Sequence, residues 1–532
     1  MTQAMVSAPQ PEAVEAGLDI LRQGGNVVDA GIGAALVQTA VDPLMCGIAG
    51  FGCCHVRLAD GTHHLIDFHG LAPRAATPDM WEARVERECD DGFGFILSDR
   101  ANEIGYQCMT SPMTLRAFSQ ILGAHGTRTL SDLIQPAIQH IEEGVLVRPA
   151  MNAFWTRPET AGRIGGSERV SRFPWVAKIY CPDGRPLGIG QTLRNPDMAR
   201  TYRRIADEGI EIFYEGEIAQ AMISDIQGHG GILDHADLAN QPQHSDPLWV
   251  DYRGYRIATN QPPGGGLVIA IMLRILERFD LAAMGHNSPD YIATVSEAMK
   301  IATVEKDTRM GDPNHVTIPV DEMLSDTFAD AMAERIRSGH KTHVPRMNPG
   351  HESKETTHIC VADAAGNCLS MTHTLGSSSG SITDGLGYMY NNAMMVFDPR
   401  PGRPGSLAPG KARFSALSPT IVFKDGAPFM LLGAPGGTTI TMGNLQAILN
   451  AIDFGMNAQQ AVSAPRFTTT SDTIEVTNRI FRGAERELQA RGYPTRRIPF
   501  SYFTPIVQAI RFGPDGLDGG ADPSGDGMAA GL

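Results

Sequence analysis

The sequence lacks the marks of a chain that binds nucleic acid or spans a membrane. Its 532 residues include 44 Lys and Arg against 59 Asp and Glu, a formal net charge of −15. Affinity for nucleic acid depends mainly on basic side chains that meet phosphate. The most apolar region, 30–54, is interrupted by Asp42, Pro43 and several glycines, so it falls short of a continuous apolar span. We therefore expect neither a nucleic-acid partner nor a membrane partner.

Cysteine is scarce, and no targeting segment is visible. The chain has eight cysteines, and its first residues, "MTQAMVSAPQPEAVEAG", show no basic segment followed by an apolar core. Cysteines in a chain without a secretory signal are typical of reduced thiols. These features predict a cytoplasmic protein.

Glycine (58 residues) and proline (35) are abundant, as in a compact, loop-rich protein that mixes helices and strands. Apolar periodicity predicts helices at 11–24, 27–41, 113–123, 131–143, 196–208, 266–278, 289–305 and 440–453. Strand-like runs joined by turn residues predict three hairpins, at 50–68 around "ADGT", at 357–374 around "AAGN", and at 420–433 around "DG".

Two motifs suggest chemistry but are weak. "GSSSG" at 376–380 matches the nucleophile elbow of serine hydrolases, yet no helix pattern follows it, so we expect a polar loop. A second group of residues resembles a metal cluster: Cys46, Cys53, Cys54, His55, His63, His64 and His69. Adjacent cysteines on a strand point to opposite faces, and no C-x2-C spacing is present. We predict buried, apolar-type cysteines, no metal and no cofactor.

Two glycine-rich stretches, "QPPGGGLV" (261–268) and "GAPGGTTI" (433–440), match neither phosphate-binding fingerprint. Their glycines still expose backbone N–H groups, in the second case just before a predicted helix. Such N–H groups suit a developing negative charge.

Many blocks in one order carry a more specific signal. They are "LRQGGNVVDAGIGAALVQTAVDPLMCGIAGFG", "LIDFHGLAPRAA", "HGTRTLSDLIQPAIQHIEEG", "DYRGYRIATNQPPGGG", "TTHICVADAAGNCLSMTHTL", "LSPTIVFKDG", "GAPGG" and "ADPSGDGMAAGL". With these blocks the chain resembles the γ-glutamyltranspeptidase family of N-terminal-nucleophile hydrolases almost end to end. The resemblance implies an α+β fold, a four-layer αββα sandwich with two central antiparallel sheets.

The resemblance also implies self-cleavage of the Glu355–Thr356 bond. It would leave a large chain, 1–355, and a small chain, 356–532, that stay associated in one integrated domain. A threonine hydroxyl is a poor nucleophile without a nearby base. A free α-amine, with a pKa of about 7.7–8, suits that role better at neutral pH than a lysine at about 10.4. Cleavage would create this amine on Thr356 itself.

Other roles follow by matched position. Thr374 corresponds to the second threonine, which hydrogen-bonds the nucleophile, and Gly436 and Gly437 correspond to the paired glycines of the oxyanion hole. The Pro/Gly-rich segment 397–413 corresponds in place to a lid loop.

The departures from the family pattern concentrate in substrate recognition. Typical members hold the α-carboxylate and α-amino group of a γ-glutamyl substrate at a small set of positions. Here these positions carry His69 (in place of Arg), Gly70, Gly376, Ala393, Val396 and Ala416, with Ser415 retained. Because each lost charged hydrogen bond costs roughly 1.5–3 kcal/mol, γ-glutamyl affinity is expected to be low.

The sequence therefore favours a self-processing amidohydrolase or acyltransferase that acts on a non-glutamyl small-molecule amide. One alternative is a true γ-glutamyltransferase or glutathione hydrolase in which another residue, such as Arg74, supplies the charge from a shifted position. A second is a non-catalytic relative that uses the pocket for binding, which the intact set of Thr356, Thr374 and the glycine pair disfavours. A homo-oligomer of the processed heterodimer stays open.

Overall fold

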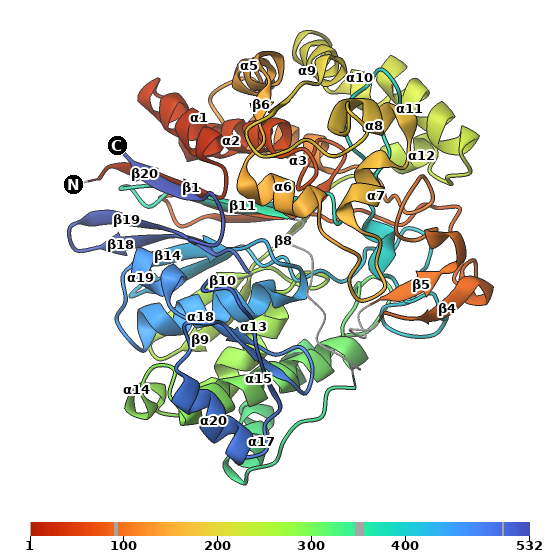
Figure 1. The fold of residues 1–532 in the computed structure, drawn as a ribbon. Coiled ribbons are helices and arrows are strands. Elements are labelled where there is room, and N and C mark those ends of the chain that lie inside the picture. The colour runs from red at the N-terminus through yellow and green to blue at the C-terminus, as the bar shows by residue number, and fades with distance from the viewer. Residues whose placement is uncertain (1, 90–93, 346–355, 503–504) are drawn as a thin grey trace.

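Two antiparallel sheets lie face to face between two layers of helices (Figure 1). The computed structural model describes residues 2–89, 94–345, 356–502 and 505–532. The seven-stranded sheet has the order β20 (Met528–Gly531), β1 (Ala4–Ala8), β11 (Thr357–Asp363), β12 (Cys368–Thr374), β2 (Phe51–Arg57), β3 (His63–Phe68) and β8 (Gln243–Ser245). The six-stranded sheet has the order β19 (Gly516–Ala521), β18 (Gln508–Gly513), β14 (Ala427–Gly433), β13 (Thr420–Lys424), β10 (Tyr255–Thr259) and β9 (Leu248–Tyr252). This arrangement confirms the predicted αββα sandwich.

One helical layer covers the seven-stranded sheet and continues into the helices beside it. It comprises α1 (Pro11–Arg22), α2 (Val27–Val41), α3 (Thr114–His125), α4 (Leu130–Leu133), α5 (Gln135–Glu143), α6 (Pro149–Trp155), α7 (Gly166–Ser171), α8 (Pro174–Tyr180), α9 (Pro196–Glu208), α10 (Glu211–Tyr214), α11 (Glu217–Gly228) and α12 (His235–Leu238). The other layer comprises α13 (Gly266–Leu276), α14 (Leu281–Met284), α15 (Pro289–Arg309), α16 (Val320–Met323), α17 (Asp326–Arg337), α18 (Ile440–Ile452), α19 (Ala458–Ser463) and α20 (Arg482–Ala490).

The predicted helices and hairpins are present, with one break. The expected helix at 131–143 is divided into α4 and α5 at Ile134, because Pro136 has no N–H to continue the hydrogen-bond ladder. Two short strand pairs and a small three-stranded sheet lie outside the two large sheets. They are β4 (Val85–Glu88) with β5 (Phe95–Leu97), β6 (Val145–Leu146) with β7 (Thr192–Leu193), and β15 (Phe467–Thr468) with β16 (Ile474–Val476) and β17 (Thr495–Arg497).

The alternation of side chains along β11 builds two separate cores. Ile359 and Val361 pack in the cluster between the seven-stranded sheet and its helices. Cys360 and Ala362, which point to the other face, pack in the cluster between the two sheets. A strand that is buried on both faces needs apolar residues at nearly every position, and "HICVA" supplies them.

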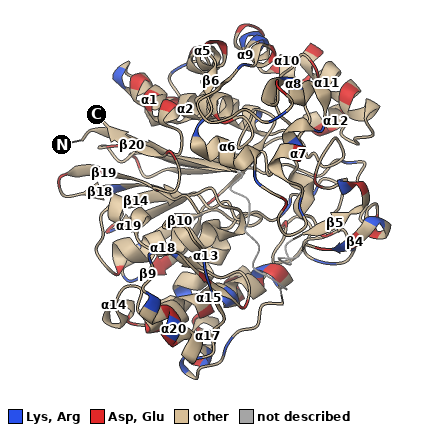
Figure 2. Cartoon of the chain, viewed as in Figure 1, with Lys and Arg blue, Asp and Glu red and all other residues tan. Residues whose placement is uncertain are grey.

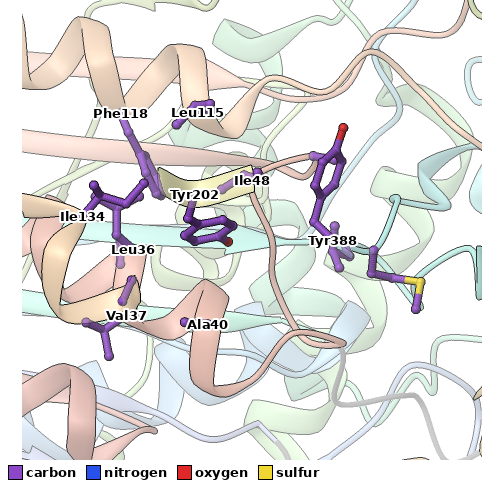
Figure 3. Packing of buried hydrophobic residues seen from close by; sticks show 14 of the residues in the cluster. Leu36, Val37, Ala40, Ile48, Leu115, Phe118, Ile134, Tyr202 and Tyr388 are labelled. Atoms are coloured by element: carbon purple, nitrogen blue, oxygen red, sulfur yellow. The ribbon is translucent and has the colours of Figure 1, made fainter. Parts of the chain in front are cut away.

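Helix α2 lies close against these central strands and is buried along its whole length. Gly31 makes the approach possible, because a Cβ there would lie 2.7 Å from the side chain of Leu369 on β12. Asn26 caps the helix by accepting hydrogen bonds from the N–H groups of Val28 and Asp29. Figure 3 shows the other side of α2, where Leu36, Val37 and Ala40 pack near Leu115, Phe118, Ile134 and Tyr202.

Charged residues lie mostly on the outer helices and loops, whereas the central strands carry few of them (Figure 2). Among the described helices, none is both long enough and apolar enough to cross a membrane. The strands come from both sides of position 356: β1, β2 and β3 precede it, whereas β11, β12 and β20 follow it.

Three buried histidines lead to a prediction about acid stability. Burial lowers the pKa of His55, His358 and His373 to about 3 in each case. The unfolded chain binds protons at these side chains below a pKa of about 6.5, while the folded protein does not until about pH 3. We expect the free energy of unfolding to fall as the pH drops from 6.5 toward 3, by up to about 1.4 kcal/mol per pH unit for each histidine. The unfolding temperature should fall with it.

Thermal unfolding at pH 7.5, 6.0 and 5.0, at constant ionic strength, measures this slope. Replacing the exposed His340 by Asn serves as the control and is expected to leave the slope unchanged. His358→Gln is expected to make the slope shallower. A wild-type midpoint that does not fall between pH 6.0 and pH 5.0 would contradict the neutral, buried state of these side chains.

Candidate active site

Thr356 and Thr374 lie next to each other at the open end of the β11–β12 hairpin. Thr357 is paired with His373 across the two strands, which brings the residue before β11 to the end of β12. The Thr356 hydroxyl donates a hydrogen bond to Thr374 Oγ1 at 3.3 Å, and Thr374 Oγ1 also accepts from the N–H of Gly376 at 2.9 Å. The predicted cleavage partner, Glu355, lies outside the described residues.

A buried network of hydrogen bonds supports the start of β11. Gln38 on α2 donates to Thr357 Oγ1 and to Gln10 Oε1, each at 2.8 Å, and its Oε1 lies 2.8 Å from His373 Nε2. Because an amide oxygen only accepts, His373 must carry its proton on Nε2. Sequence reasoning missed this network, although a glutamine in the otherwise mainly apolar helix α2 was a visible signal. The network fixes the backbone that carries Thr356.

Gly436 and Gly437 lie at the entry to α18, through the short 3-10 turn η4 (Gly437–Thr439). Both have backbone conformations that suit glycine, with φ of 149° and 58°. A Cβ on Gly436 would also lie 2.7 Å from that of Pro505. The positive end of the α18 dipole therefore faces the same region as these backbone N–H groups.

A pocket of about 80 Å³ opens in front of Thr356. Part of its wall comes from the sites predicted for catalysis and recognition, namely Gly376, Val396, Ser415, Ala416 and Gly437. The rest is Arg157, Thr160, Arg163, Ser377, Met395, Arg413, Phe414, Leu417, Thr438 and Ile440. Three arginines line the pocket, Arg157, Arg163 and Arg413, and none of the described lining residues is Asp or Glu. The pocket therefore has a largely apolar wall and a positively charged edge formed by these arginines.

His69 lies behind this wall rather than in it. Its side chain has no exposed surface, and its Nδ1 is 2.6 Å from Asp67 Oδ1. The carboxylate must accept there, so in the neutral ring Nε2 accepts from the hydroxyl of Ser415 at 2.8 Å. Ser415 Oγ also accepts from the N–H of Leu417. Asp67 and His69 thus orient Ser415, and the protein itself occupies both ring nitrogens.

The remaining recognition positions are small or apolar in the structure as well. Gly376 has φ of 73°, and a Cβ there would lie 2.5 Å from Asn392 Oδ1, which accepts from the N–H of Ser377. Ala393 is fully buried, whereas Val396 and Ala416 line the pocket. No described helix directly follows "GSSSG", so the nucleophile-elbow reading is not supported.

Arginines close to the pocket differ from the one considered at the sequence level. Arg74 is exposed and is not part of the pocket wall. Arg413, which sequence reasoning did not single out, ends the segment 397–413 and lines the pocket. That segment is held by its own contacts, among them hydrogen bonds from Lys411 Nζ to the carbonyls of Pro404 and Ser406.

The cysteines near the site are buried in the core and do not form a metal-binding cluster among the described residues. Cys46, Cys53 and Cys54 are buried free thiols, and burial raises the pKa of each. His55 bonds His63 at 3.0 Å instead of a cysteine. Within the described ranges, no group of three His, Cys, Asp or Glu side chains is arranged to hold a metal ion.

The antiparallel four-layer sandwich is the fold of the N-terminal-nucleophile hydrolases. The crystal structure of cephalosporin acylase from Bacillus halodurans matches it with a TM-score of 0.87 and 29% sequence identity, covering 100% of this chain and 96% of that one.

The gamma-glutamyltranspeptidase family model matches residues 13–532, and the chain belongs to this family. It is 36% identical to the acylase ACY 1 proenzyme of Pseudomonas sp. (strain V22), over 98% of this chain and 92% of that protein. It is 31% identical to the glutathione hydrolase proenzyme of Escherichia coli (strain K12), over 99% of this chain and 92% of that protein. These matches confirm the family resemblance and an amide-hydrolase class.

The contact between Gly376 and Asn392 can be tested directly. Gly376→Ala is expected to destabilise the protein by about 2–3 kcal/mol, because the new Cβ adds a clash to the cost of a left-handed conformation. Gly339→Ala is the matched control, since its φ of 76° is similar but no atom lies within 4 Å of the added Cβ.

Thermal unfolding of Gly376→Ala, Gly339→Ala, Asn392→Ser, and Gly376→Ala combined with Asn392→Ser gives the measurement. The double variant is expected to be less destabilised than the sum of its two single changes. Equal losses for Gly376→Ala and Gly339→Ala would mean that Asn392 does not restrict this position.

Proposed function

We propose that this protein is a self-processing amidohydrolase that cleaves small-molecule amides through an acyl-enzyme on Thr356, with an acyl group other than γ-glutamyl. One observation carries the proposal. His69 occupies the position of the arginine that grips the α-carboxylate in typical members, and both of its ring nitrogens are already bonded to Asp67 and Ser415. It therefore has no ring N–H left to replace the bidentate hydrogen bonds of an arginine.

The chemistry follows from the groups around Thr356. After cleavage before this residue, its α-amine would take the hydroxyl proton while Oγ attacks the carbonyl carbon of the amide. The N–H groups of Gly436 and Gly437 would stabilise the negative charge on the carbonyl oxygen. The amine then hands the proton to the leaving nitrogen, the C–N bond breaks, and an ester to Thr356 remains. Water releases the acid from this ester, and a second amine in place of water would give acyl transfer.

Processing into two chains is part of the proposal. Relatives at 36% and 31% identity are named proenzymes. After a cut at 355–356, the large chain would keep β1 and β2 while the small chain would keep β11 and β12. Because β11 pairs with β1 and β12 pairs with β2, the two chains would remain joined along the middle of one sheet.

A true γ-glutamyltransferase or glutathione hydrolase is the second candidate. The relationship to the E. coli glutathione hydrolase and the positive edge of the pocket favour it, since an arginine there could take an α-carboxylate. The α-ammonium group argues against it. Ala393 is buried and Val396 is apolar, and the described lining residues offer no carboxylate to pair with an ammonium.

Processing gives the first test. Purified protein is expected to resolve into two chains, with Thr356 as the first residue of the smaller one. Thr356→Ala should remain a single inactive chain, because the attacking hydroxyl is gone, whereas Thr356→Ser should still be cut. Denaturing gels with intact-mass analysis provide the measurement. A preparation that hydrolyses amides while it stays full length would contradict the mechanism in which the free α-amine of Thr356 acts as the base.

Substrate choice gives the second test. Glutaryl-p-nitroanilide differs from γ-glutamyl-p-nitroanilide only by the missing α-amino group. We expect kcat/KM to be about 5- to 150-fold higher for the glutaryl compound, because a desolvated, unpaired ammonium costs about 1–3 kcal/mol. The control is the leaving group, which is the same in both. If the γ-glutamyl compound is turned over faster, the second candidate is the better description.

A further inference from the structure

Asp67, His69 and Ser415 are bonded to one another in the arrangement of a serine-hydrolase triad. Asp67 Oδ1 accepts from His69 Nδ1 at 2.6 Å, and His69 Nε2 accepts from the Ser415 hydroxyl at 2.8 Å. In such a triad the histidine takes the serine proton, while the carboxylate holds the ring in the required tautomer and stabilises its charge. A triad is identified by these roles and distances, whichever fold carries it.

The acid end of this triad is held firmly in place. Asp67 Oδ1 also accepts from the backbone N–H of His69 at 2.8 Å, so one carboxylate oxygen holds both the ring and the main chain. Asp67 lies on β3 between two other strands, paired with Cys53 of β2 on one side and with Gln243 of β8 on the other. The His69 side chain has no exposed surface, so its packed surroundings keep the ring on Ser415.

Ser415 is the member of the triad that reaches the pocket. Its N–H donates to the carbonyl of Pro263 at 2.8 Å, and its Oγ accepts from the N–H of Leu417 at 3.1 Å. A hydroxyl oxygen has one proton and two lone pairs. Among the described residues, the proton is bonded to His69 and one lone pair to Leu417. The second lone pair is left to attack an electrophile in the pocket.

Donors for the oxygen of an attacked carbonyl lie next to Ser415. Ala416 lines the pocket, and its N–H is bonded to no acceptor in the part of the chain that the structure describes. The N–H of the residue after the nucleophile is one of the two oxyanion donors in α/β-hydrolases.

The second group is the guanidinium of Arg413, which lines the same pocket. Its carbon lies 5.0 Å from the centre of the Phe51 ring, and its Nε is buried without a partner among the described residues. Burial lowers the pKa of this guanidinium to about 10, so it remains charged at neutral pH. A fixed positive charge beside the nucleophile stabilises the negative charge that develops on an attacked carbonyl.

We propose that Ser415 is a second nucleophile, activated by His69 and Asp67, and that the protein hydrolyses small esters through an acyl-enzyme on this serine. His69 takes the hydroxyl proton as Oγ bonds to the carbonyl carbon, and it passes the proton to the leaving oxygen as the C–O bond breaks. Water that loses a proton to His69 then attacks the serine ester, and the acid is released with the serine restored. Esters are the expected class because an alkoxide or phenolate leaves more readily than an amide nitrogen. The step uses neither Thr356 nor its α-amine, so it is separate from the proposed function.

Covalent labelling of the wild-type protein tests the nucleophile. Diisopropyl fluorophosphate phosphorylates activated serines with loss of fluoride, and we expect the label on Ser415. Ser377 is the internal control, because it lines the same pocket and its hydroxyl is bonded to no histidine among the described residues. It should react at least about 100-fold more slowly, since a general base contributes about 100- to 10,000-fold. Trypsin releases Ser415 in the peptide 414–424, apart from Thr356 and Ser377, so mass spectrometry resolves the sites.

A second probe, p-nitrophenyl acetate, reports the acyl-enzyme itself. Brief incubation followed by an acid quench is expected to leave an acetyl group on Ser415, found in the same peptide. Ser415→Ala should lose this acetyl group and the fluorophosphate label in that peptide, because the attacking oxygen is gone.

Variants of the other two members test the activation. His69→Gln removes the base, and Asp67→Asn removes the acceptor that sets the ring tautomer. Each is expected to lower the labelling rate of Ser415 by about 100-fold or more, and to remove the rise of this rate with pH that loss of the His69 proton produces. His64→Gln is the matched control and should leave the rate unchanged, since His64 lies on β3 with Asp67 but stacks on His125. The unfolding temperature of each variant shows whether it has folded.

Three outcomes would overturn the proposal. They are the absence of label on Ser415, a labelling rate no higher than that of Ser377, and an unchanged rate and pH dependence in a folded His69→Gln or Asp67→Asn variant. Failure of the proposed function is read separately, from chain processing and from the hydrolysis of glutaryl and γ-glutamyl anilides, which depend on Thr356.

Discussion

The antiparallel pairing of β11 with β12 brings the two threonine hydroxyls together, and nearly every other feature of the site depends on it. Thr356 precedes one strand and Thr374 ends the other, so the register alone sets their contact. That register is held from one side by α2, through Gly31 against Leu369 and through Gln38 beneath Thr357. It is held from the other side by the second sheet. A one-residue slip would turn the side chains of the shifted strand to the opposite face and separate the hydroxyls.

Local patterns were sufficient for the elements that build this site. The hairpin around "AAGN" and the helices at 27–41 and 440–453 were predicted because turn residues and apolar periodicity are local signals. Strands β1 and β20 were not predicted. Their sequences, "AMVSA" and "MAAG", are short and consist largely of small residues, and they become strands only because β11 offers an edge for β1, which in turn pairs with β20.

The sequence positions of the site residues could be predicted, but the contacts between their side chains could not. Family resemblance located His69 and Ser415, yet the bond between them joins residues 346 positions apart, and no local pattern reports it. That bond changes the interpretation of His69 from a group that meets the substrate to one that orients Ser415. Arg413 was overlooked for the same reason. Its meaning depends on the Phe51 ring beneath it and on the absence of a described acidic partner, both of which are properties of the folded chain.

Taken together, His69 and Arg413 suggest how the same catalytic frame can serve a different acyl group. A positive charge next to a zwitterionic substrate must be accompanied by a negative one, or the α-ammonium is left unpaired. Here the described lining residues supply arginines and apolar side chains but no carboxylate. Asp67 bonds His69 and is not among the residues that line the pocket. A substrate with one anionic end and no ammonium matches this distribution of charge, whereas a γ-glutamyl group would satisfy only half of its own charges.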